Sequence, residues 1–239
     1  MKPILVIEQE YSLRGLGLLG DRLDASGVPY RSLRAWAERI EDVDLGDLAA
    51  VIPLGGTQHA WEDGRDGTLR SERKLLAEAV ESGVPVFGIC LGGQLLAHVL
   101  GGKVSPAPTP ERGWVEIAPV NGSRDDPIFA VLERATGVYQ WHEDVFEPPP
   151  GAVVLASSHA APNQAFRVAG AEAWGIQFHP ETTPELWELW IARHPKEVAA
   201  AGVDIEALRR DVYTGAKASS EFCAGLFDAF IDRVSHRDE

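Results

Sequence analysis

Cysteine and basic side chains are scarce in this chain of 239 residues, and each scarcity excludes a class of protein. The two cysteines, Cys90 and Cys223, are too few for a disulfide-stapled secreted scaffold. Lys and Arg number 22 against 36 Asp and Glu, which gives a formal net charge of −14. A surface this acidic repels phosphate backbones and anionic lipid heads, so we expect no nucleic-acid partner and no membrane partner.

Long hydrophobic runs are also absent, because no stretch approaches the roughly 20 apolar residues that span a bilayer. The apolar run at 4–7 is too short for a signal peptide and is typical of a first strand. The sequence therefore predicts a cytoplasmic protein, in which a free thiol stays reduced.

The chain is 45% hydrophobic and long enough to bury a substantial core, so we expect a single domain over 1–239. Apolar runs alternate with helical spacing in the first half, which indicates a three-layer α/β/α fold with a central, mostly parallel sheet. The second half reads mainly as strands, followed by a helical C-terminal extension over 183–239. The expected strands are 4–7, 28–30, 49–54, 84–89, 114–120, 152–157, 164–168 and 173–178. The expected helices are 16–23, 68–80, 92–100, 204–213 and 218–234, with a further helical stretch from 183.

Residues 88–93, Gly-Ile-Cys-Leu-Gly-Gly, lie between an expected strand and an expected helix. This is the pattern of a nucleophile elbow with Cys90 in place of serine. Glycines two positions to either side let the strand and helix pass closely, and the helix amino terminus favours a thiolate. The backbone N–H of Leu91 is placed to stabilise an oxyanion. Cys223 has no such setting and is interpreted as helix packing.

Two motifs together resemble the class I (triad) glutamine amidotransferase family. Residues 88–94, which end in Gln94, resemble its elbow, and residues 175–181, Gly-Ile-Gln-Phe-His-Pro-Glu, resemble its second signature. The resemblance covers most of the chain and is strongest to stand-alone members similar to the glutaminase domain of GMP synthase. It implies a flavodoxin-like fold and a hydrolase that needs neither a metal nor an organic cofactor.

The resemblance also implies a catalytic triad. Cys90 would be the nucleophile, His179 the general base, and Glu181 the group that orients and stabilises the imidazolium. The oxyanion hole would combine the N–H of Leu91 with the glycine turn that follows the strand at 49–54. That turn matches Gly55 and Gly56; the alternative is an ordinary tight turn. Thr57 stands where the family usually has proline, which predicts a looser loop.

Substrate-binding residues are carried over in the same way. Gln94 matches the position whose amide holds the amino-acid end of glutamine; the alternative is a solvent-facing helix residue. Residues 140–144 resemble a Ser-His-x-Asp loop that lines the pocket, with Trp141 in place of serine. His142 is therefore a candidate substrate-binding residue, and a structural histidine is the alternative. Residues 111–114, Glu-Arg-Gly-Trp, resemble a segment of stand-alone members and receive no role.

The expected reaction is hydrolysis of the side-chain amide of glutamine through a Cys90 thioester, with release of ammonia and glutamate. A γ-glutamyl peptidase or hydrolase cleaves a chemically similar amide and stays an alternative, with specificity set by a rim that includes 57–61 and Trp141. A non-catalytic binding or regulatory module is the second alternative. A related cysteine-elbow family has histidine directly after the cysteine, where Leu91 stands. The α/β-hydrolases place the acid before the histidine, whereas Glu181 follows His179.

The segment after Glu181 is nearly sixty residues long, which is more than a glutaminase subunit of GMP synthase usually has. We expect it to form a lid, a dimer surface or a docking site, with Trp187 and Trp190 packed in a core. No synthetase segment is recognised in the sequence. The resemblance leaves two options open: the ammonia passes to a separate synthetase, or the protein acts on γ-glutamyl compounds.

Overall fold

The computed structural model describes residues 1–120 and 122–236, so the last three residues of the expected extension lie outside the described part. The strands are β1 (Ile4–Glu8), β2 (Tyr30–Arg34), β3 (Ala50–Pro53), β4 (Val86–Ile89), β5 (Lys103–Pro119), β6 (Thr136–Glu147), β7 (Val153–Ser158), β8 (Ala165–Arg167) and β9 (Ala173–Ile176). The helices are α1 (Gly17–Ser26), α2 (Thr68–Glu81), α3 (Leu91–Val99), α4 (Pro184–Arg193), α5 (Pro195–Ala200), α6 (Ile205–Ala218) and α7 (Ser220–Ser235).

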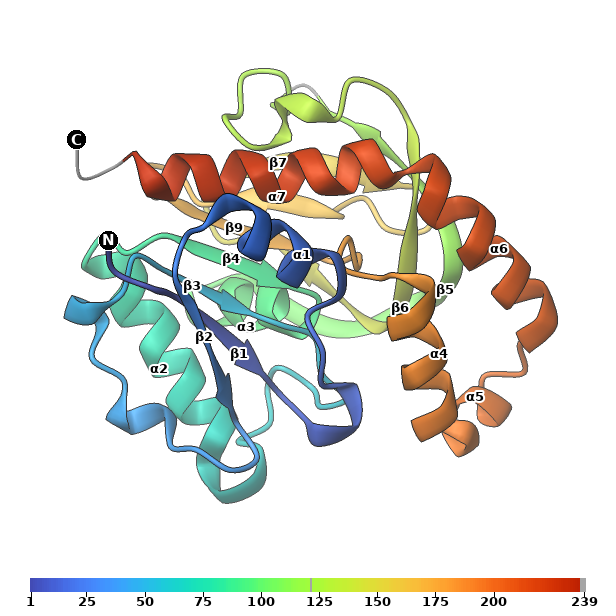
Figure 1. The fold of residues 1–239 in the computed structure, drawn as a ribbon, viewed down its shortest axis with the longest axis horizontal. Coiled ribbons are helices and arrows are strands. Elements are labelled where there is room, and N and C mark those ends of the chain that lie inside the picture. The colour runs from blue at the N-terminus through green and yellow to red at the C-terminus, as the bar shows by residue number, and fades with distance from the viewer. Residues whose placement is uncertain (121, 237–239) are drawn as a thin grey trace.

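The strands of the described residues form one nine-stranded sheet in the order β2-β1-β3-β4-β9-β8-β7-β5-β6 (Figure 1). Alternate side chains of the buried strands face opposite layers of helices. Ile4 and Val6 share a core with α1 and α7, whereas Leu5 and Ile7 share one with α2 and α3. The predicted three-layer α/β class is therefore confirmed.

The sheet is more mixed than the sequence predicted. Strands β2, β1, β3, β4 and β9 pair in parallel, and the pairings from β9 through β8, β7 and β5 to β6 are antiparallel. Strand β6 and the first part of β5 were not predicted from the sequence. Pro106, Pro108 and Pro110 interrupt the strand pattern there, and the β5–β6 register shifts between Pro106 and Glu111.

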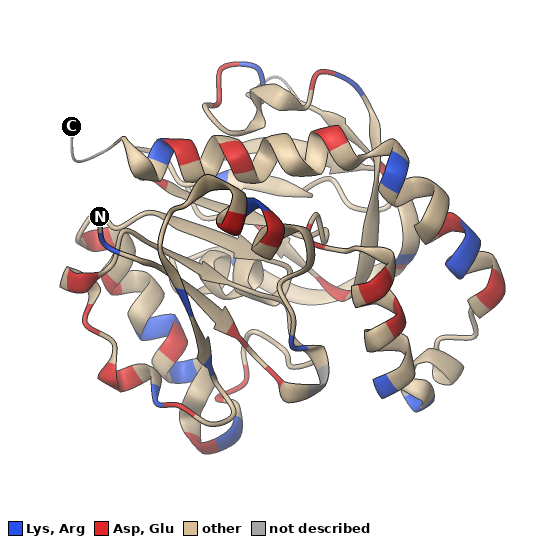
Figure 2. Cartoon of the chain, in the orientation of Figure 1, with Lys and Arg blue, Asp and Glu red and all other residues tan. Residues whose placement is uncertain are grey.

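The C-terminal helices pack on the body of the protein. Phe230 of α7 lies 5.3 Å from Phe87 of β4 between ring centroids, and Trp187 of α4 is fully buried. Figure 2 shows both acidic and basic positions along α4, α6 and α7. One ion pair joins two of these helices, with Arg209 Nε of α6 2.5 Å from Glu188 Oε1 of α4. The prediction that the tryptophan cluster packs in a core thus holds for Trp187. Among the described residues, no helix has the length and apolar character needed to cross a bilayer.

Candidate active site

Cys90 occupies a sharp turn between β4 and α3. Its backbone has φ 51° and ψ −109°, a conformation that a residue with a side chain rarely adopts. Two backbone hydrogen bonds hold it there, from Cys90 N–H to Ile176 O at 2.8 Å and from Gln94 N–H to Cys90 O at 2.9 Å. Hydrogen bonds to β9 and α3 thus keep Cys90 in this strained conformation.

The glycines around Cys90 are required by close contacts between backbones. A Cβ atom on Gly88 would lie 2.6 Å from the Gly92 carbonyl carbon, and one on Gly92 would lie 2.1 Å from Pro53 O. A Cβ atom on Gly93 would lie 2.6 Å from Ile176 O. Helix α3 therefore passes β3, β4 and β9 at a distance that only glycine permits, as the elbow pattern predicted.

His179 and Glu181 follow β9 and reach the same place. The His179 Nδ1 atom lies 2.7 Å from Glu181 Oε1, and both side chains are almost fully buried. Burial by itself lowers the pKa of His179, but the charges and hydrogen bonds of Glu181 and Cys90 outweigh it and raise the pKa to about 10. The imidazolium form is therefore favoured at neutral pH. The Trp190 ring covers His179 edge-on, with 5.5 Å between centroids.

The glycine turn after β3 lies directly against these groups. A Cβ atom on Gly55 would lie 2.9 Å from His179 Cε1, and one on Gly56 would lie 2.7 Å from Leu91 Cδ2. Among the described residues, the backbone N–H groups of Gly55, Gly56 and Leu91 have no hydrogen-bond partner. These donors are free to meet a developing negative charge beside the nucleophile.

The expectation of a looser loop at Thr57 is not met. The Thr57 N–H donates to Glu10 Oε1 at 2.8 Å, and its hydroxyl bonds the same oxygen. Proline could not make the first bond because it has no N–H. Threonine at this position therefore ties the glycine turn to the segment that follows β1.

A pocket of about 220 Å³ opens over the elbow. It is lined by Leu13, Gly15, Leu54, Gly55, Gly56, Thr57, Gln58, His59, Cys90, Gln94, Tyr139, Trp141, His142, Glu143, Asp144, His179, Glu181, Trp190, Ile191, His194 and Val198. The nominated catalytic, oxyanion-hole and substrate-binding residues are thus brought together, except that the buried side chain of Leu91 lies outside the lining. Of the expected rim, 57–59 and Trp141 line the pocket, whereas Ala60 and Trp61 do not. The pocket wall formed by α4 and α5, which includes Ile191 and Val198, was not predicted from the sequence.

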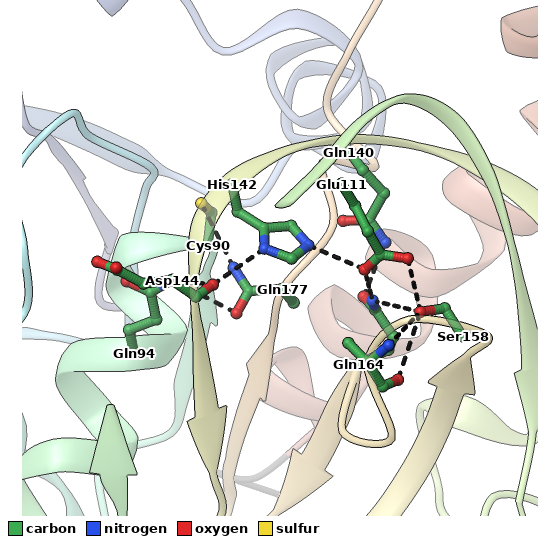
Figure 3. Close-up of polar contacts among 10 residues, drawn as sticks. Cys90, Gln94, Glu111, Gln140, His142, Asp144, Ser158, Gln164 and Gln177 are labelled. Carbon is green, nitrogen blue, oxygen red and sulfur yellow. Dashed lines mark hydrogen bonds and ion pairs between the residues drawn. The ribbon is translucent and has the colours of Figure 1, made fainter. Parts of the chain in front are cut away.

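A buried chain of amide groups leads away from Cys90 (Figure 3). The Gln177 Nε2 atom donates to Cys90 Sγ at 3.8 Å. The Gln94 Nε2 atom contacts Gln177 Oε1 at 3.4 Å and Asp144 O at 3.3 Å. Gln177 was not singled out from the sequence, although it stands two residues before His179 in the second signature. The structure places its amide directly on the nucleophile.

His142 and Glu111 form a second buried pair at the far end of this network (Figure 3). They are cross-strand partners in β5 and β6, with His142 Nε2 3.1 Å from Glu111 Oε2. The other ring nitrogen of His142 lies 2.9 Å from Asp144 O. Both ring nitrogens are thus engaged within the protein. This favours the structural alternative for His142, although the residue lines the pocket.

Glu111 is held as a carboxylate by its neighbours. Burial alone raises the pKa of Glu111, but hydrogen bonds from His142, Ser158 and Gln164 lower it below the ordinary value for glutamate. Ser158 Oγ donates to Glu111 Oε1 at 2.7 Å, and Gln164 Nε2 donates to Glu111 Oε2 at 2.6 Å. The Glu-Arg-Gly-Trp segment, which had no role from the sequence, therefore supplies the anion that anchors His142.

Comparison with known families gives one match over most of the chain. The model of the family "Glutamine amidotransferase class-I" matches residues 32–193. The chain is similar to the protein named GMP synthase [glutamine-hydrolyzing] of Caldanaerobacter subterraneus, with 43% identity over 60% of this chain and 26% of that protein. It is 32% identical to the protein of the same name from Corynebacterium glutamicum, over 75% of this chain and 32% of that protein. The chain thus spans about a quarter to a third of the length of these relatives.

Two solved structures resemble the whole described fold. A glutamine amidotransferase of Thermotoga maritima has a TM-score of 0.86 at 26% identity, over 98% of both chains. A glutamine amidotransferase of Methylobacillus flagellatus has a TM-score of 0.85 at 27% identity, over 97% of this chain and 95% of the other. Coverage this high means that the likeness extends beyond the family match and into the C-terminal helices.

Proposed function

Because the chain belongs to the class I glutamine amidotransferase family, we propose that it hydrolyses the side-chain amide of glutamine to glutamate and ammonia. Cys90 is the nucleophile, His179 the acid and base, and Glu181 the carboxylate that orients the imidazole. One observation carries the proposal: the strained Cys90 and the bonded His179–Glu181 pair meet at the floor of one pocket. A nucleophile, a base and an orienting group in this relation are what amide cleavage requires.

In the first half of the reaction, the Cys90 thiolate attacks the amide carbon and the carbonyl oxygen takes the negative charge. The free N–H groups of Leu91 and of Gly55 or Gly56 hold that oxygen. The His179 imidazolium gives its proton to the amide nitrogen as the carbon–nitrogen bond breaks. Ammonia leaves, and the γ-glutamyl group remains on sulfur as a thioester.

Water completes the reaction. His179, now neutral, takes a proton from the attacking water, and the same N–H groups hold the second tetrahedral intermediate. The carbon–sulfur bond breaks, glutamate leaves, and the thiolate and imidazolium are restored. Glu181 stabilises the charged imidazole in both halves, and its contact with Nδ1 turns the other ring nitrogen to the reacting atoms.

The ammonia acceptor is proposed to be a separate synthetase. The relatives named GMP synthase are three to four times longer than the region that this chain matches, which supports acceptor chemistry outside the region described above. We also propose that 1–239 is a single domain. The packing of α7 against the sheet, with Phe227 and Phe230 in the same core as Ile4, supports that organisation.

Hydrolysis of a γ-glutamyl peptide or amide is the second candidate. It is favoured by the wall that α4 and α5 add to the pocket, with Trp190, Ile191 and Val198. An apolar wall suits a leaving amine larger than ammonia, because burial of its carbon atoms would contribute to binding. The bond that breaks is the same in both cases.

Glutamate release from L-glutamine and from a panel of γ-glutamyl amides and peptides tests the proposal, with Cys90→Ala as the control. Release from glutamine that is lost in Cys90→Ala is the expected result. A strong preference for a γ-glutamyl peptide would replace the glutaminase assignment by the second candidate. If no compound is turned over in a Cys90-dependent way, the hydrolase proposal is wrong.

A further inference from the structure

The glycine turn that carries the candidate oxyanion donors is held by different means at its two ends. At its start, the Leu54 N–H donates to Ile7 O at 3.0 Å, and Leu54 O accepts from the Gly92 N–H at 3.2 Å. These backbone bonds tie the start of the turn to β1 and α3. Gly55 and Gly56 come next, and glycine restrains its own backbone less than any other residue. The direction of their N–H groups therefore depends on what holds the far end of the turn.

The far end of the turn is held by the carboxylate of Glu10. Its Oε1 atom accepts two hydrogen bonds from Thr57, one from the backbone N–H at 2.8 Å and one from the side-chain hydroxyl. Hydrogen bonds to a charged acceptor are stronger than those to a neutral one, and these two fix both the backbone and the side chain of Thr57. Because Thr57 directly follows Gly56, the same bonds restrict rotation of the peptide groups in the turn.

The residue before Glu10 supports the turn from behind. A Cβ atom on Gly56 would lie 3.0 Å from Gln9 Cβ, so the Gln9 side chain packs directly against the turn. Gln9 is itself fixed, because its Nε2 atom donates to Oε1 of the buried Glu72 at 2.7 Å. Two consecutive side chains after β1 therefore act on the same turn, Gln9 by packing and Glu10 by hydrogen bonding.

The loop that contains Glu10 is attached to the body of the protein on both sides. The Gly15 N–H donates to Glu8 Oε2 at 3.0 Å, which closes the loop at its base. Trp190 Nε1 of α4 donates to Leu13 O at 3.1 Å, which joins the loop to the helix that covers the pocket. The Glu10 carboxylate therefore extends from an anchored backbone and can serve as a fixed point for the turn.

We propose that Glu10 is a positioning residue for the oxyanion hole. Through Thr57 it orients the N–H groups of the two glycines toward the reacting carbonyl oxygen. The inference rests on the proposed function. Glu10 is not among the residues that line the pocket, so it acts through Thr57 and not by contact with the substrate. Donors that are aimed in advance need no reorganisation as the charge develops, so they stabilise the transition state more than the bound substrate.

Steady-state kinetics with L-glutamine test this role. Glu10→Met removes the acceptor and should lower kcat about 10- to 100-fold, with KM changed less than about threefold. Glu10→Gln keeps an oxygen that can accept both hydrogen bonds and should retain most of the activity. Thr57→Ser keeps both donors and should behave in the same way. Glu38→Met is the matched control, because Glu38 Oε1 accepts from the backbone N–H of Arg34 at 3.0 Å and does not line the pocket.

Alkylation of Cys90 by iodoacetamide separates the oxyanion hole from the nucleophile. The thiolate displaces iodide from the methylene carbon of the reagent and attacks no carbonyl carbon, so the oxyanion donors are not used. Glu10→Met should therefore be alkylated at the wild-type rate, with a thermal midpoint equal to that of the control. An unchanged kcat, a slowed alkylation, or a Glu10→Gln variant as slow as Glu10→Met would each overturn the inference and leave the proposed function intact.

Amide hydrogen exchange followed by NMR reports on the turn without any turnover. The Thr57 N–H should exchange about tenfold faster or more in Glu10→Met than in the wild type, because it loses its acceptor. If the wild type hydrolyses no glutamine but Glu10→Met accelerates this exchange, the tie between Glu10 and the turn stands and the hydrolase proposal fails. If glutamine is hydrolysed and neither exchange nor kcat responds to Glu10→Met, the hydrolase proposal stands and the inference is wrong.

Discussion

The two buried histidine–carboxylate pairs differ in what is left for the second ring nitrogen. In the His179–Glu181 pair the carboxylate holds Nδ1 at 2.7 Å, and the rest of the ring faces Cys90 and the glycine turn. In the His142–Glu111 pair the carboxylate holds Nε2 at 3.1 Å and a backbone carbonyl holds Nδ1 at 2.9 Å. The second ring nitrogen of His179 is therefore available to the reacting atoms, whereas both ring nitrogens of His142 are hydrogen-bonded within the fold.

The partners of the carboxylates differ as well. Glu111 accepts hydrogen bonds from Ser158 and Gln164 in addition to His142, whereas Glu181 Oε2 is buried without a partner among the described residues. A fully satisfied carboxylate gives rigidity, and a partly satisfied one keeps more of its negative charge for the imidazolium. Burial and pairing alone therefore do not distinguish the two histidines, and the second ring nitrogen is the feature that supports the role proposed for His179.

The largest expected effect is the loss of glutamine turnover when His179 is replaced. We expect His179→Asn to lower kcat for glutamine about 10⁴-fold or more, as loss of a base in comparable triads does. The fold-decrease in kcat caused by His142→Asn should be at least about a hundred times smaller, because the His142 ring makes no contact with the nucleophile. Parallel assays of glutamate release with both variants check the ratio. Equal losses at the two positions would show that the distinction between the pairs is mistaken.

The next effect is on the free energy of unfolding, for which the His142–Glu111 pair should matter more than the His179–Glu181 pair. Glu111→Leu should destabilise the protein by about 3–5 kcal/mol, because it leaves three hydrogen-bonding side chains, His142, Ser158 and Gln164, without their partner inside the protein. Glu181→Leu removes a single hydrogen bond, to a histidine at the pocket floor, and should cost less. Urea unfolding of both variants measures the difference. A smaller loss for Glu111→Leu than for Glu181→Leu would contradict the structural role of the second pair.

The first pair could be predicted because the family resemblance rests on short segments of the sequence. His179 and Glu181 stand two residues apart at the end of a short apolar strand, and Cys90 stands between a strand and a helix with glycines around it. Each of these motifs lies within one continuous segment, so it can be recognised without knowing which strands pair. The core strands β1, β3, β4 and β9 were predicted for the same reason, because a run of buried apolar residues suffices to define them.

The second pair depends on the register between β5 and β6, which cannot be predicted from either strand alone. Glu111 and His142 meet only because β5 and β6 pair across the bulge near Pro106. Strand β6 alternates polar and apolar residues around buried His142 and Asp144, so its inward polar positions hide the strand pattern. A helical stretch from 183 was predicted, but the position of α4 and α5 over the pocket was not. That position depends on a long-range contact, in which Trp187 Nε1 donates a hydrogen bond to the Tyr139 hydroxyl. Long-range pairings of this kind are invisible to periodicity.

Glu72 extends the comparison to a buried carboxyl that has no histidine. It lies in α2 behind the glycine turn, and Gln9 Nε2 donates to its Oε1 at 2.7 Å. Burial raises the pKa of Glu72 to about 8, against the opposing effects of the Gln9 hydrogen bond and the Arg73 charge. The folded pKa lies above the unfolded one, so the stabilising contribution is complete below the ordinary glutamate pKa and is lost as the pH rises through about 8.

We therefore expect Glu72→Gln to gain stability over the wild type as the pH rises. The difference should be on the order of 1 kcal/mol or more at about pH 9 and should shrink toward about pH 5, where both side chains are neutral in the folded protein. Urea unfolding of the two proteins across this range measures it. A difference that does not vary with pH would mean that Glu72 keeps the same charge when the protein unfolds.

The smallest effect concerns the amide that touches the nucleophile. Gln177 donates to Cys90 Sγ at 3.8 Å, and Gln140 lies in the same buried network but bonds Gln164 instead. We expect Gln177→Met to slow alkylation of Cys90 by iodoacetamide near neutral pH by about tenfold, because a thiolate loses a hydrogen-bond donor. Gln140→Met, the matched control, should leave that rate unchanged.

Cys223 does not interfere with this measurement, because burial raises the pKa of its thiol to about 12 and keeps it unreactive. If Gln177→Met and Gln140→Met alkylate at the wild-type rate, the amide contact with sulfur has no electrostatic role. If both are slowed equally, the whole network positions Cys90 and Gln177 adds nothing of its own. Slowing by Gln177→Met alone would show that the pocket floor carries a fourth group acting on the nucleophile, supplied by the same short motif that carries His179 and Glu181.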